Sequence, residues 1–364
     1  MTDGDCAVLV TGATGFIGRK MVCRLAADGR RIVALARPLD GQPAEARVRA
    51  AIDPLPPGAH LTVVAADLAQ LAAVAPADLA WLRDTVVTVI HCAGNTWFVA
   101  GERDAFLASH VDGPVALLEA LAGGRLRHFA HMSTAFVCGR RDGHVLEDED
   151  DVGQRFHNPY ERAKLDAEMA LKRAAVASGI DVRVLRPSIV VGEAPATAGG
   201  VPSNLFFAVV RLLARVAALG TGASRALRLP GAPAAPFNAV PVEYVVDAAV
   251  ALAEGPEAAH GTFHVVTSES PTQEAVLAMI SQALGLEGAR IVEAQQMADD
   301  ASPFEGRLAR MLGPYAEYLA QDVRFDDRRA RSVLDAAGVP RATLDVDAVQ
   351  RLVGLALAGE TVAP

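Results

Sequence analysis

A glycine-rich turn near the start of the chain limits the possible folds more than any other feature. Ala7–Val10 is a short, wholly apolar run, as expected of a parallel strand that is buried on both faces. It leads into Thr11-Gly12-Ala13-Thr14-Gly15-Phe16-Ile17-Gly18, and from Phe16 onward apolar residues recur at helical spacing. Glycines in such a turn let a pyrophosphate approach the backbone at the positive end of the following helix. The sequence therefore predicts a strand, a turn and a helix that together bind a dinucleotide.

The end of the next expected strand indicates which dinucleotide is bound. The run Arg31–Ala36 ends at Arg37, about twenty residues beyond the last glycine, where an acid binds the ribose 2′-hydroxyl and an arginine accommodates a 2′-phosphate. Arg19, directly after Gly18, can add a second cation to the same phosphate. We therefore expect NADP, as NADPH, while Asp40 lies close enough to keep NAD as the alternative.

Further apolar runs alternate with helical patterns along the first two-thirds of the chain. Strands are expected at Leu61–Ala65, within Val86–Asn95, which runs into a small-residue turn, and at His128–Met132, with a helix over Phe106–Leu121. This alternation predicts an α/β fold built on a doubly wound parallel sheet of Rossmann type. The predicted division is a nucleotide-binding domain over 1–192, to which 237–268 return, and a substrate-binding region over 193–236 and 269–364.

Three side chains later in the chain form a pattern suited to carbonyl chemistry. Tyr160 and Lys164 are four residues apart and lie on one face of an expected helix, so the ammonium should lower the phenol pKa from about 10. Ser133 and Thr134 directly follow the expected strand His128–Met132, and either hydroxyl can bind a reacting carbonyl oxygen. Tyr160 can pass the proton while Lys164 holds the cofactor ribose. The predicted catalytic set is Thr134, Tyr160 and Lys164.

Six motifs together resemble the extended short-chain dehydrogenase/reductase family, over about the first two hundred residues. They are the glycine turn, Asp67-Leu68, His91-Cys92-Ala93-Gly94, Ser133-Thr134-Ala135, Tyr160-x-x-x-Lys164 and Arg186-Pro187-Ser188-Ile189-Val190-Val191-Gly192. The resemblance implies that Thr134 takes the catalytic hydroxyl position and that Asp67 contacts adenine, although a helix cap is the alternative for Asp67. The implied cofactor contacts are Gly12, Thr14, Gly15, Phe16, Ile17, Gly18, Asp67, Leu68, Cys92, Ala93, Gly94, Lys164, Pro187, Ser188, Ile189 and Val190.

One position departs from the pattern of this family. The family usually carries Asn-x-x-Gly-Thr on the helix before the catalytic strand, and this chain has His110-Val111-Asp112-Gly113-Pro114. His110 replaces an asparagine that is thought to support the lysine through a water relay. Both a packing role and a functional role are open for this histidine.

Within the family, three segments look most like thioester reductase domains and fatty acyl-CoA reductases. They are residues 133–140, 156–161 and 238–247. The implied activity is NADPH-dependent reduction of a hydrophobic acyl thioester, carried on CoA or on the pantetheine arm of an acyl carrier protein. The alternatives are a ketoreductase or hydroxy dehydrogenase, a nucleotide-sugar epimerase or dehydratase, and a non-catalytic cofactor sensor. Ser133, Ser203 and Asn204 are the candidate substrate contacts, beside an apolar helix at Leu205–Val216.

Composition argues against several other classes of protein. The net charge is −9 and there is no long basic run, so we expect no nucleic-acid partner. Four cysteines without metal spacing fit reduced thiols in the cytoplasm, and the acidic run Glu147–Asp151 lacks the spacing of a metal loop. We expect no metal site, no signal peptide and no membrane span, because Leu205–Val216 is short and carries two arginines. The family resemblance also suggests a homodimer.

Overall fold

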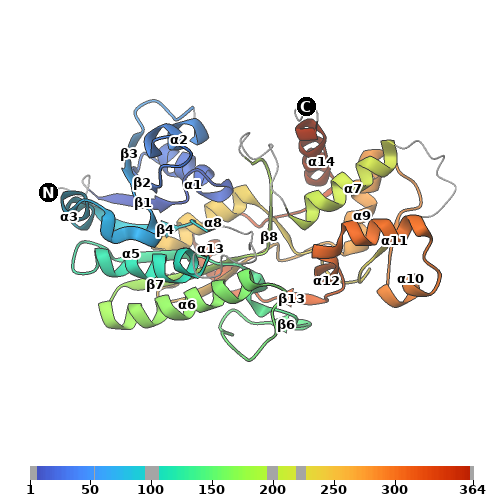
Figure 1. The fold of residues 1–364 in the computed structure, drawn as a ribbon. Helices are drawn as coiled ribbons and strands as arrows, with labels where there is room; N and C mark the ends of the chain where they lie inside the picture. The colour runs from blue at the N-terminus through green and yellow to red at the C-terminus, as the bar shows by residue number, and fades with distance from the viewer. Residues whose placement is uncertain (1–5, 53, 95–105, 195–203, 219–226, 361–364) are drawn as a thin grey trace.

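A seven-stranded parallel sheet forms the centre of the computed structural model, which describes residues 6–52, 54–94, 106–194, 204–218 and 227–360 (Figure 1). The strand order is β11-β7-β5-β4-β1-β2-β3, so the chain winds outward from β1 in both directions. The strands are β1 (Ala7–Thr11), β2 (Arg31–Ala36), β3 (His60–Ala65), β4 (Val86–His91), β5 (His128–Met132), β7 (Asp181–Pro187) and β11 (Thr262–Val265). The predicted α/β class and doubly wound sheet are confirmed.

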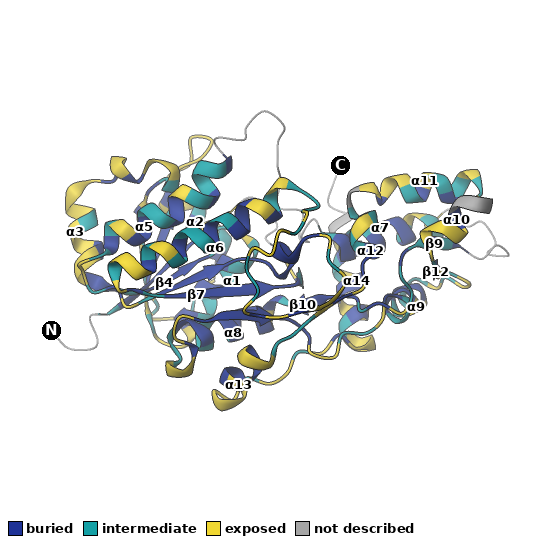
Figure 2. Ribbon diagram, turned by 90° about the horizontal axis from the view of Figure 1, so that it is seen from below, coloured by how far each residue is buried: buried dark blue, intermediate teal, exposed yellow. Residues whose placement is uncertain are grey.

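Helices cover both faces of the sheet because its strands are apolar on both sides. Val8 and Val10 of β1 pack against one layer of helices, while Ala7 and Leu9 face the other, following the two-residue period of a strand. The first layer consists of α1 (Phe16–Ala27), α2 (Ala44–Ile52), α8 (Val242–Glu254) and α13 (Arg328–Ala336). The second consists of α3 (Pro76–Thr85), α5 (Gly113–Leu121) and α6 (Pro159–Ser178). Figure 2 shows the buried strands between these layers.

A second core lies beside the sheet, in what we call the C-terminal lobe (right-hand side of Figure 1). Its elements are α7 (Leu205–Ala218), β9 (Arg228–Pro230), α9 (Gln273–Leu284), β12 (Arg290–Val292), α10 (Ala294–Asp300), α11 (Pro303–Met311), α12 (Ala316–Leu319) and α14 (Val346–Glu360). Val276, Leu277 and Ile280 of α9 contribute to the core of the lobe. No helix in the described part of the chain is long and apolar enough to cross a membrane.

Short parallel strand pairs connect the lobe to the sheet. β8 (Ile189–Val191) pairs with β10 (Ala239–Pro241), and β6 (Gly143–Val145) pairs with β13 (Val323–Phe325). The segment 237–268 contributes α8 and β11 to the sheet and its helical cover. α13 packs on α8 as well, although it falls in the range assigned to substrate binding. The domain boundaries inferred from the sequence stay a prediction.

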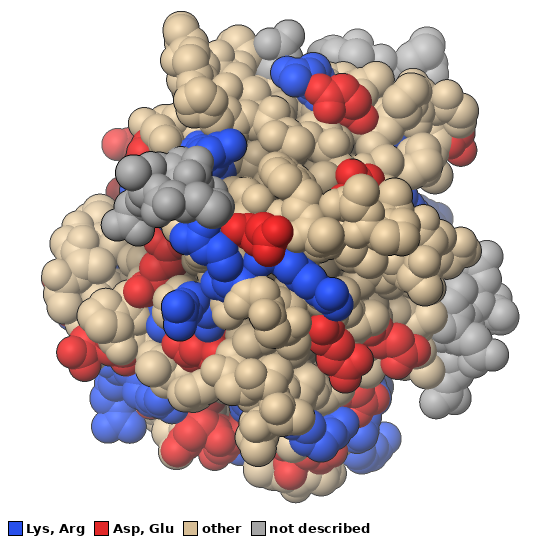
Figure 3. Space-filling view, turned by 90° about the vertical axis from the view of Figure 1, so that its left-hand side faces the viewer, with Lys and Arg blue, Asp and Glu red and all other residues tan. Residues whose placement is uncertain are grey.

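Basic side chains gather at the amino edge of the sheet. Arg30 and Arg31 stand at the start of β2, and Arg125 and Arg127 precede β5; Figure 3 faces this edge. Arg30 pairs with Glu254 at 2.7 Å, and Arg125 donates to the Cys6 sulfur at 3.0 Å. The motif residues lie instead at the carboxyl edge, where ligands of such sheets bind.

Candidate active site

The glycine turn packs directly against the end of β4. Gly12 has a φ of 70°, and a Cβ there would lie only 2.8 Å from the backbone nitrogen of Ala93. A Cβ on Gly18 would overlap the carbonyl of Gly12, because α1 begins immediately beside the turn. Gly15 precedes the first residue of α1 and donates its backbone N–H to the Gly12 carbonyl at 2.8 Å. The turn therefore requires glycine, and its geometry suits a phosphate at the helix terminus.

The end of β4 is fixed to β1 by one hydroxyl. Thr11 accepts a hydrogen bond from the backbone N–H of Ala93 at 3.1 Å and shares another with Nδ1 of His91 at 2.9 Å. Burial raises the pKa of the Cys92 thiol to about 12, so the thiol is neutral. Gly94 follows, and the point where its Cβ would lie is 3.4 Å from both Lys164 Nζ and His110 Nε2. The small-residue turn thus lets the side chains of Lys164 and His110 approach the end of β4.

Local sequence explains why α6 begins where it does. Asn158 caps the helix by accepting the Glu161 N–H at 3.0 Å, and Pro159 occupies the first helical position. Tyr160 therefore lies in the first turn, and Lys164 lies one turn further on the same face. The helix positions both side chains at the carboxyl edge of the sheet.

Burial controls the ionisation of this pair. Lys164 is 4% exposed, donates to the Met132 carbonyl at 2.8 Å, and has its pKa lowered to about 8 by desolvation. Its Nζ lies 5.9 Å from the centre of the Tyr160 ring. The sequence suggested a lowered tyrosine pKa, and this was wrong: desolvation, helped by Glu161, raises the pKa of Tyr160. In the absence of ligand, Tyr160 is a protonated phenol that can donate.

The two neighbouring hydroxyls differ in what they bind. Ser133 donates a short hydrogen bond to the buried carboxylate of Glu168, which also pairs with Arg186 at 2.6 Å. Thr134 caps a short 3₁₀ turn, where its oxygen accepts the Phe136 N–H at 3.3 Å. The Ser133 proton is therefore engaged, whereas the Thr134 proton has no acceptor among the described residues.

His110 lies close to the predicted catalytic pair. It belongs to a π-helical turn, η3 (Ala108–Asp112), a type of turn that often occurs at functional sites. Its Nδ1 lies 2.9 Å from the Phe106 carbonyl, and its ring meets the Tyr160 ring edge-on at 6.1 Å between centroids. The structure places His110 beside both Tyr160 and Lys164, and its role stays open.

Two further histidines lie nearby: His91, which opens one of the six motifs, and His131, and the sequence assigned no role to either side chain. His91 and His131 are paired in register on β4 and β5, and their rings stack at 5.3 Å. Both are fully buried, so desolvation lowers both pKa values, that of His91 to about 3, and the nearby Lys164 lowers them further. Each is therefore neutral near pH 7. The signal in the sequence was one histidine near the carboxyl end of each strand. The pairing of β4 with β5 places these two histidines side by side.

The opposite end of the predicted cofactor site is solvent-exposed. Arg37 is exposed at the end of β2, and Arg47, which sequence reasoning missed, donates to the Arg37 carbonyl at 2.5 Å. Arg19 donates to the Glu193 carbonyl at 2.5 Å. Asp67 caps the 3₁₀ helix η2 (Leu68–Ala73) by accepting the Ala69 N–H at 3.0 Å. The capping role considered for Asp67 is present, and its adenine contact stays a prediction.

The remaining predicted residues lie between the sheet and the lobe. Pro187 ends β7, and Ile189 and Val190 belong to β8. Ser188 between them is buried, and its hydroxyl has no hydrogen-bond partner among the described residues. Asn204 donates to the Val190 carbonyl at 2.8 Å and accepts the Phe207 N–H at 3.2 Å, so its side chain links β8 to α7. Ser203 lies outside the described residues.

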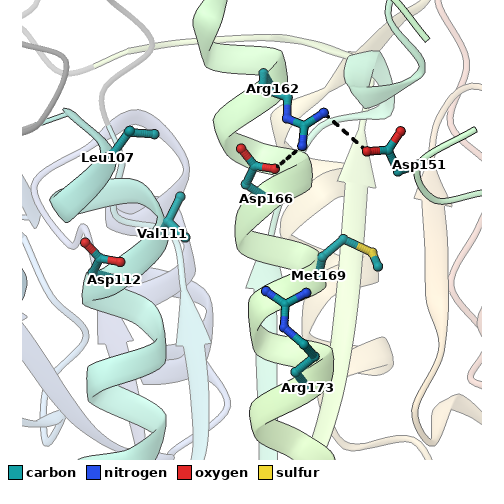
Figure 4. A pocket seen from close by; sticks show the side chains of 8 residues that line it. All are labelled: Leu107, Val111, Asp112, Asp151, Arg162, Asp166, Met169 and Arg173. Carbon is teal, nitrogen blue, oxygen red and sulfur yellow. Dashed lines mark hydrogen bonds and ion pairs between the residues drawn. The ribbon is translucent and has the colours of Figure 1, made fainter. Parts of the chain in front are cut away.

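A separate hollow of about 540 Å³ lies between η3 and α6 (Figure 4). Its lining residues are Leu107, Val111, Asp112, Asp151, Arg162, Asp166, Met169 and Arg173. Arg162 bridges Asp166 at 2.8 Å and Asp151 at 3.2 Å. None of the predicted catalytic side chains lines this hollow. Within the described residues, no cluster of histidine, cysteine or carboxylate side chains is arranged to hold a metal.

The strand order and the glycine turn define a dinucleotide-binding α/β protein of Rossmann type. The chain belongs to the NAD-binding family described as male sterility protein, whose model matches residues 10–249. This confirms the predicted resemblance to the extended short-chain dehydrogenase/reductase family, drawn from the six motifs, and to its thioester reductase group, drawn from the segments 133–140, 156–161 and 238–247.

Individual relatives cover only part of the chain or share little identity with it. The chain is 31% identical to a dTDP-6-deoxy-L-talose 4-dehydrogenase (NAD(P)(+)) of Kitasatospora kifunensis, over 51% of this chain and 52% of that protein. It is 30% identical to the non-ribosomal peptide synthetase CmlP of Streptomyces venezuelae, over 60% of this chain and 21% of the synthetase. The terminal R domain of the myxalamid PKS-NRPS pathway superposes with a TM-score of 0.77 at 21% identity, covering 98% and 92% of the two chains. The chain spans about half or less of the length of these two curated relatives.

Proposed function

We propose that this chain uses NADPH to reduce the carbonyl of a hydrophobic acyl thioester. The observation that carries the proposal is the position of Lys164. Its ammonium lies beside the Gly94 turn, where the cofactor is expected, and bonds the Met132 carbonyl two residues before Thr134. One side chain therefore joins the predicted nucleotide site to the predicted hydroxyl, with Tyr160 one turn away. This is the arrangement that a cofactor-dependent carbonyl reduction requires.

Each residue has a distinct role in the proposed reaction. NADPH held at the glycine turn would supply the hydride for the carbonyl carbon. Thr134 donates a hydrogen bond to the developing oxyanion, and Tyr160, which burial keeps protonated, gives it a proton. Lys164 holds the cofactor ribose and provides positive charge beside the phenol. The tetrahedral thiohemiacetal then expels the thiol, which leaves an aldehyde.

The preference for NADPH rests on the exposed Arg37, which follows β2, and on the partly buried Arg47 of α2. Arg37 occupies the position after the second strand where an acid would favour NAD and an arginine favours a 2′-phosphate, and Arg47 donates to the Arg37 carbonyl, which supports NADPH. Arg19 provides a third guanidinium beside the glycine turn once its contact to the Glu193 carbonyl is exchanged for phosphate. The cofactor itself would occupy the turn from Gly12 to Gly18.

We propose that residues 1–192 and 237–268 bind the cofactor, and that the substrate lies against residues 193–236 and 269–364. Similarity to part of a peptide synthetase and to an R domain supports a substrate on a pantetheine arm, of CoA or of a carrier protein. A homodimer in the cytoplasm is the expected setting.

Thiol release provides the decisive test. We expect NADPH oxidation with medium-chain acyl-CoA or acyl-pantetheine to be matched by equal free thiol, together with aldehyde or its alcohol. A ketone has no thiol to release. The similarity to a sugar dehydrogenase supports a second candidate, a ketoreductase or nucleotide-sugar enzyme. NADPH oxidation by ketones without thiol release, or turnover only of nucleotide sugars, would replace the thioester assignment.

A further inference from the structure

Tyr318 links the C-terminal lobe to the first turn of α6. Its hydroxyl accepts a hydrogen bond from Asn158 Nδ2 at 2.7 Å and donates a short one to Glu161 Oε1. Glu161 in turn accepts the His157 N–H at 2.9 Å. Tyr160 lies between the two residues that Tyr318 holds. The hydroxyl of Tyr318 therefore fixes the helical turn that presents the predicted proton donor.

The ring of Tyr318 contacts a second part of the predicted site. It stacks on His157 at 4.4 Å and meets the Phe136 ring edge-on at 5.2 Å. Phe136 belongs to the 3₁₀ turn that Thr134 caps. One side chain of the lobe thus contacts the segments that carry both Thr134 and Tyr160.

The segment around Tyr318 is held firmly to the sheet side of the molecule. Gln321 donates from Nε2 to the carbonyls of Gly139 at 2.7 Å and Arg141 at 2.6 Å. Arg140 pairs with Glu317 at 2.7 Å, and β13 pairs with β6 just beyond. Tyr318 is therefore placed by several independent contacts on both sides of it.

A small cavity, lined mainly by apolar and aromatic residues, lies on the lobe side of Tyr318. Its wall consists of Phe136, Ile189, Leu205, Pro236, Phe237, Asn238, Gln273, Tyr318, Leu319 and Val323. None of these residues is charged, and the two amides are bonded to backbone groups: Asn238 donates to the Val323 carbonyl and Gln273 accepts the Ala232 N–H. Ile189 belongs to β8 and is one of the cofactor contacts that the family resemblance implies, and Leu205 belongs to the lobe core. The free space is about 10 Å³, roughly what a single water needs. An apolar group larger than this can enter only if the wall moves.

We propose that this cavity receives the first carbons of the acyl chain, and that Tyr318 couples its filling to the position of Tyr160. The inference rests on the proposed thioester reduction. An acyl chain in the cavity removes apolar surface from water, which favours its entry. Because Tyr318 forms one wall, the entering chain shifts its ring, and its hydroxyl transmits the shift to Asn158 and Glu161. The length of the acyl chain therefore affects the turnover rate through the position of Tyr318.

The coupling is tested by Tyr318→Phe, which keeps the ring and removes the hydroxyl. Loss of a hydrogen bond to a carboxylate should lower kcat about ten- to a hundredfold, while KM for the thioester and NADPH affinity change less than about threefold. Tyr315→Phe is the matched control, because its hydroxyl makes no hydrogen bond among the described residues and Tyr315 does not line the cavity. Thermal melting verifies that both variants are folded. Equal kcat for the two variants would overturn the coupling.

The cavity is tested by Leu319→Ala with acyl-pantetheines of four to twelve carbons. The larger cavity should raise the ratio of kcat/KM for the longest chain to kcat/KM for the shortest chain about fivefold or more. Each additional methylene that becomes buried should contribute roughly fourfold to kcat/KM. Leu312→Ala removes an equally buried leucine of the lobe that does not line the cavity, and should leave the ratio unchanged. Phe237→Leu replaces Leu319→Ala if that variant does not fold.

The outcomes separate this inference from the proposed function. If the wild type binds NADPH and reduces no thioester, the proposed function fails and this assignment fails with it. If the wild type reduces thioesters while Leu319→Ala and Leu312→Ala show the same chain-length ratio, only the cavity assignment is overturned.

Discussion

The two ends of the predicted cofactor site are held in different ways. Lys164 is buried and bonded to a backbone carbonyl, so its pKa is shifted by desolvation. Arg37 lies in solvent, and its side chain makes no hydrogen bond to the described residues. Electrostatic contacts are strong where water is excluded and are screened where it is not. We therefore expect residues at the buried end to determine the rate of turnover, and residues at the exposed end to determine only which cofactor binds more tightly.

The largest effect should come from the buried end. Tyr160→Phe removes the proton donor and keeps the ring that packs against His110. Turnover should fall by about two to four orders of magnitude with NADPH affinity nearly unchanged. Steady-state kinetics and a fluorescence titration of NADPH measure the two quantities separately. A rate near that of the wild type on the true substrate would show that the active site is misassigned.

A smaller effect is expected at the exposed end. Arg37→Ala should weaken NADPH binding roughly ten- to a hundredfold, because a charged hydrogen bond to the 2′-phosphate is lost. NADH binding should stay nearly constant. Arg49→Ala is the matched control, since Arg49 is also exposed and pairs with Glu45 on α2. An equal loss for both cofactors would remove the basis for the NADPH assignment.

The smallest effect is a pH dependence that reports on burial. With its pKa lowered from 10.5 to about 8, Lys164 loses its proton well before an exposed lysine would. Activity that needs the ammonium is therefore present below pH 8 and falls about tenfold per unit above it. The pH profile of kcat/KM measures this in the free enzyme. Lys164→Arg should move the fall upward, because arginine stays charged. A fall near pH 10.5 would mean that Lys164 is not desolvated in solution.

The sheet was largely predictable from the sequence. Strands buried on both faces are continuous apolar runs, and Arg31–Ala36 and His128–Met132 have the bounds that the pattern suggested. The motif residues also come together as expected, since Gly12 contacts Ala93 and Gly94 faces Lys164. Their catalytic and binding roles stay predictions. Parallel strands end at one edge, and this rule alone brings distant motifs together.

The contacts between the lobe and the sheet were not predictable. β6 and β13 are three residues long and carry no period that a sequence pattern can detect. The bond from Tyr318 to Asn158 spans 160 positions, and nothing near either residue signals the other. The expected helix at Phe106–Leu121 contains a π-helical turn at Ala108–Asp112, which propensity does not encode. The tyrosine pKa was misjudged because burial cannot be read from helical spacing.

The path of α13 has a consequence for how the chain can fold. After building most of the lobe, the chain returns at Arg328–Ala336 to pack on α8, and then ends in the lobe as α14. The nucleotide-binding half is therefore incomplete until Ala336 has been made, and the lobe until Glu360 has been made. Contacts of such long sequence separation form late and slowly. The two halves should consequently unfold in one cooperative transition, and neither half should survive as an isolated fragment.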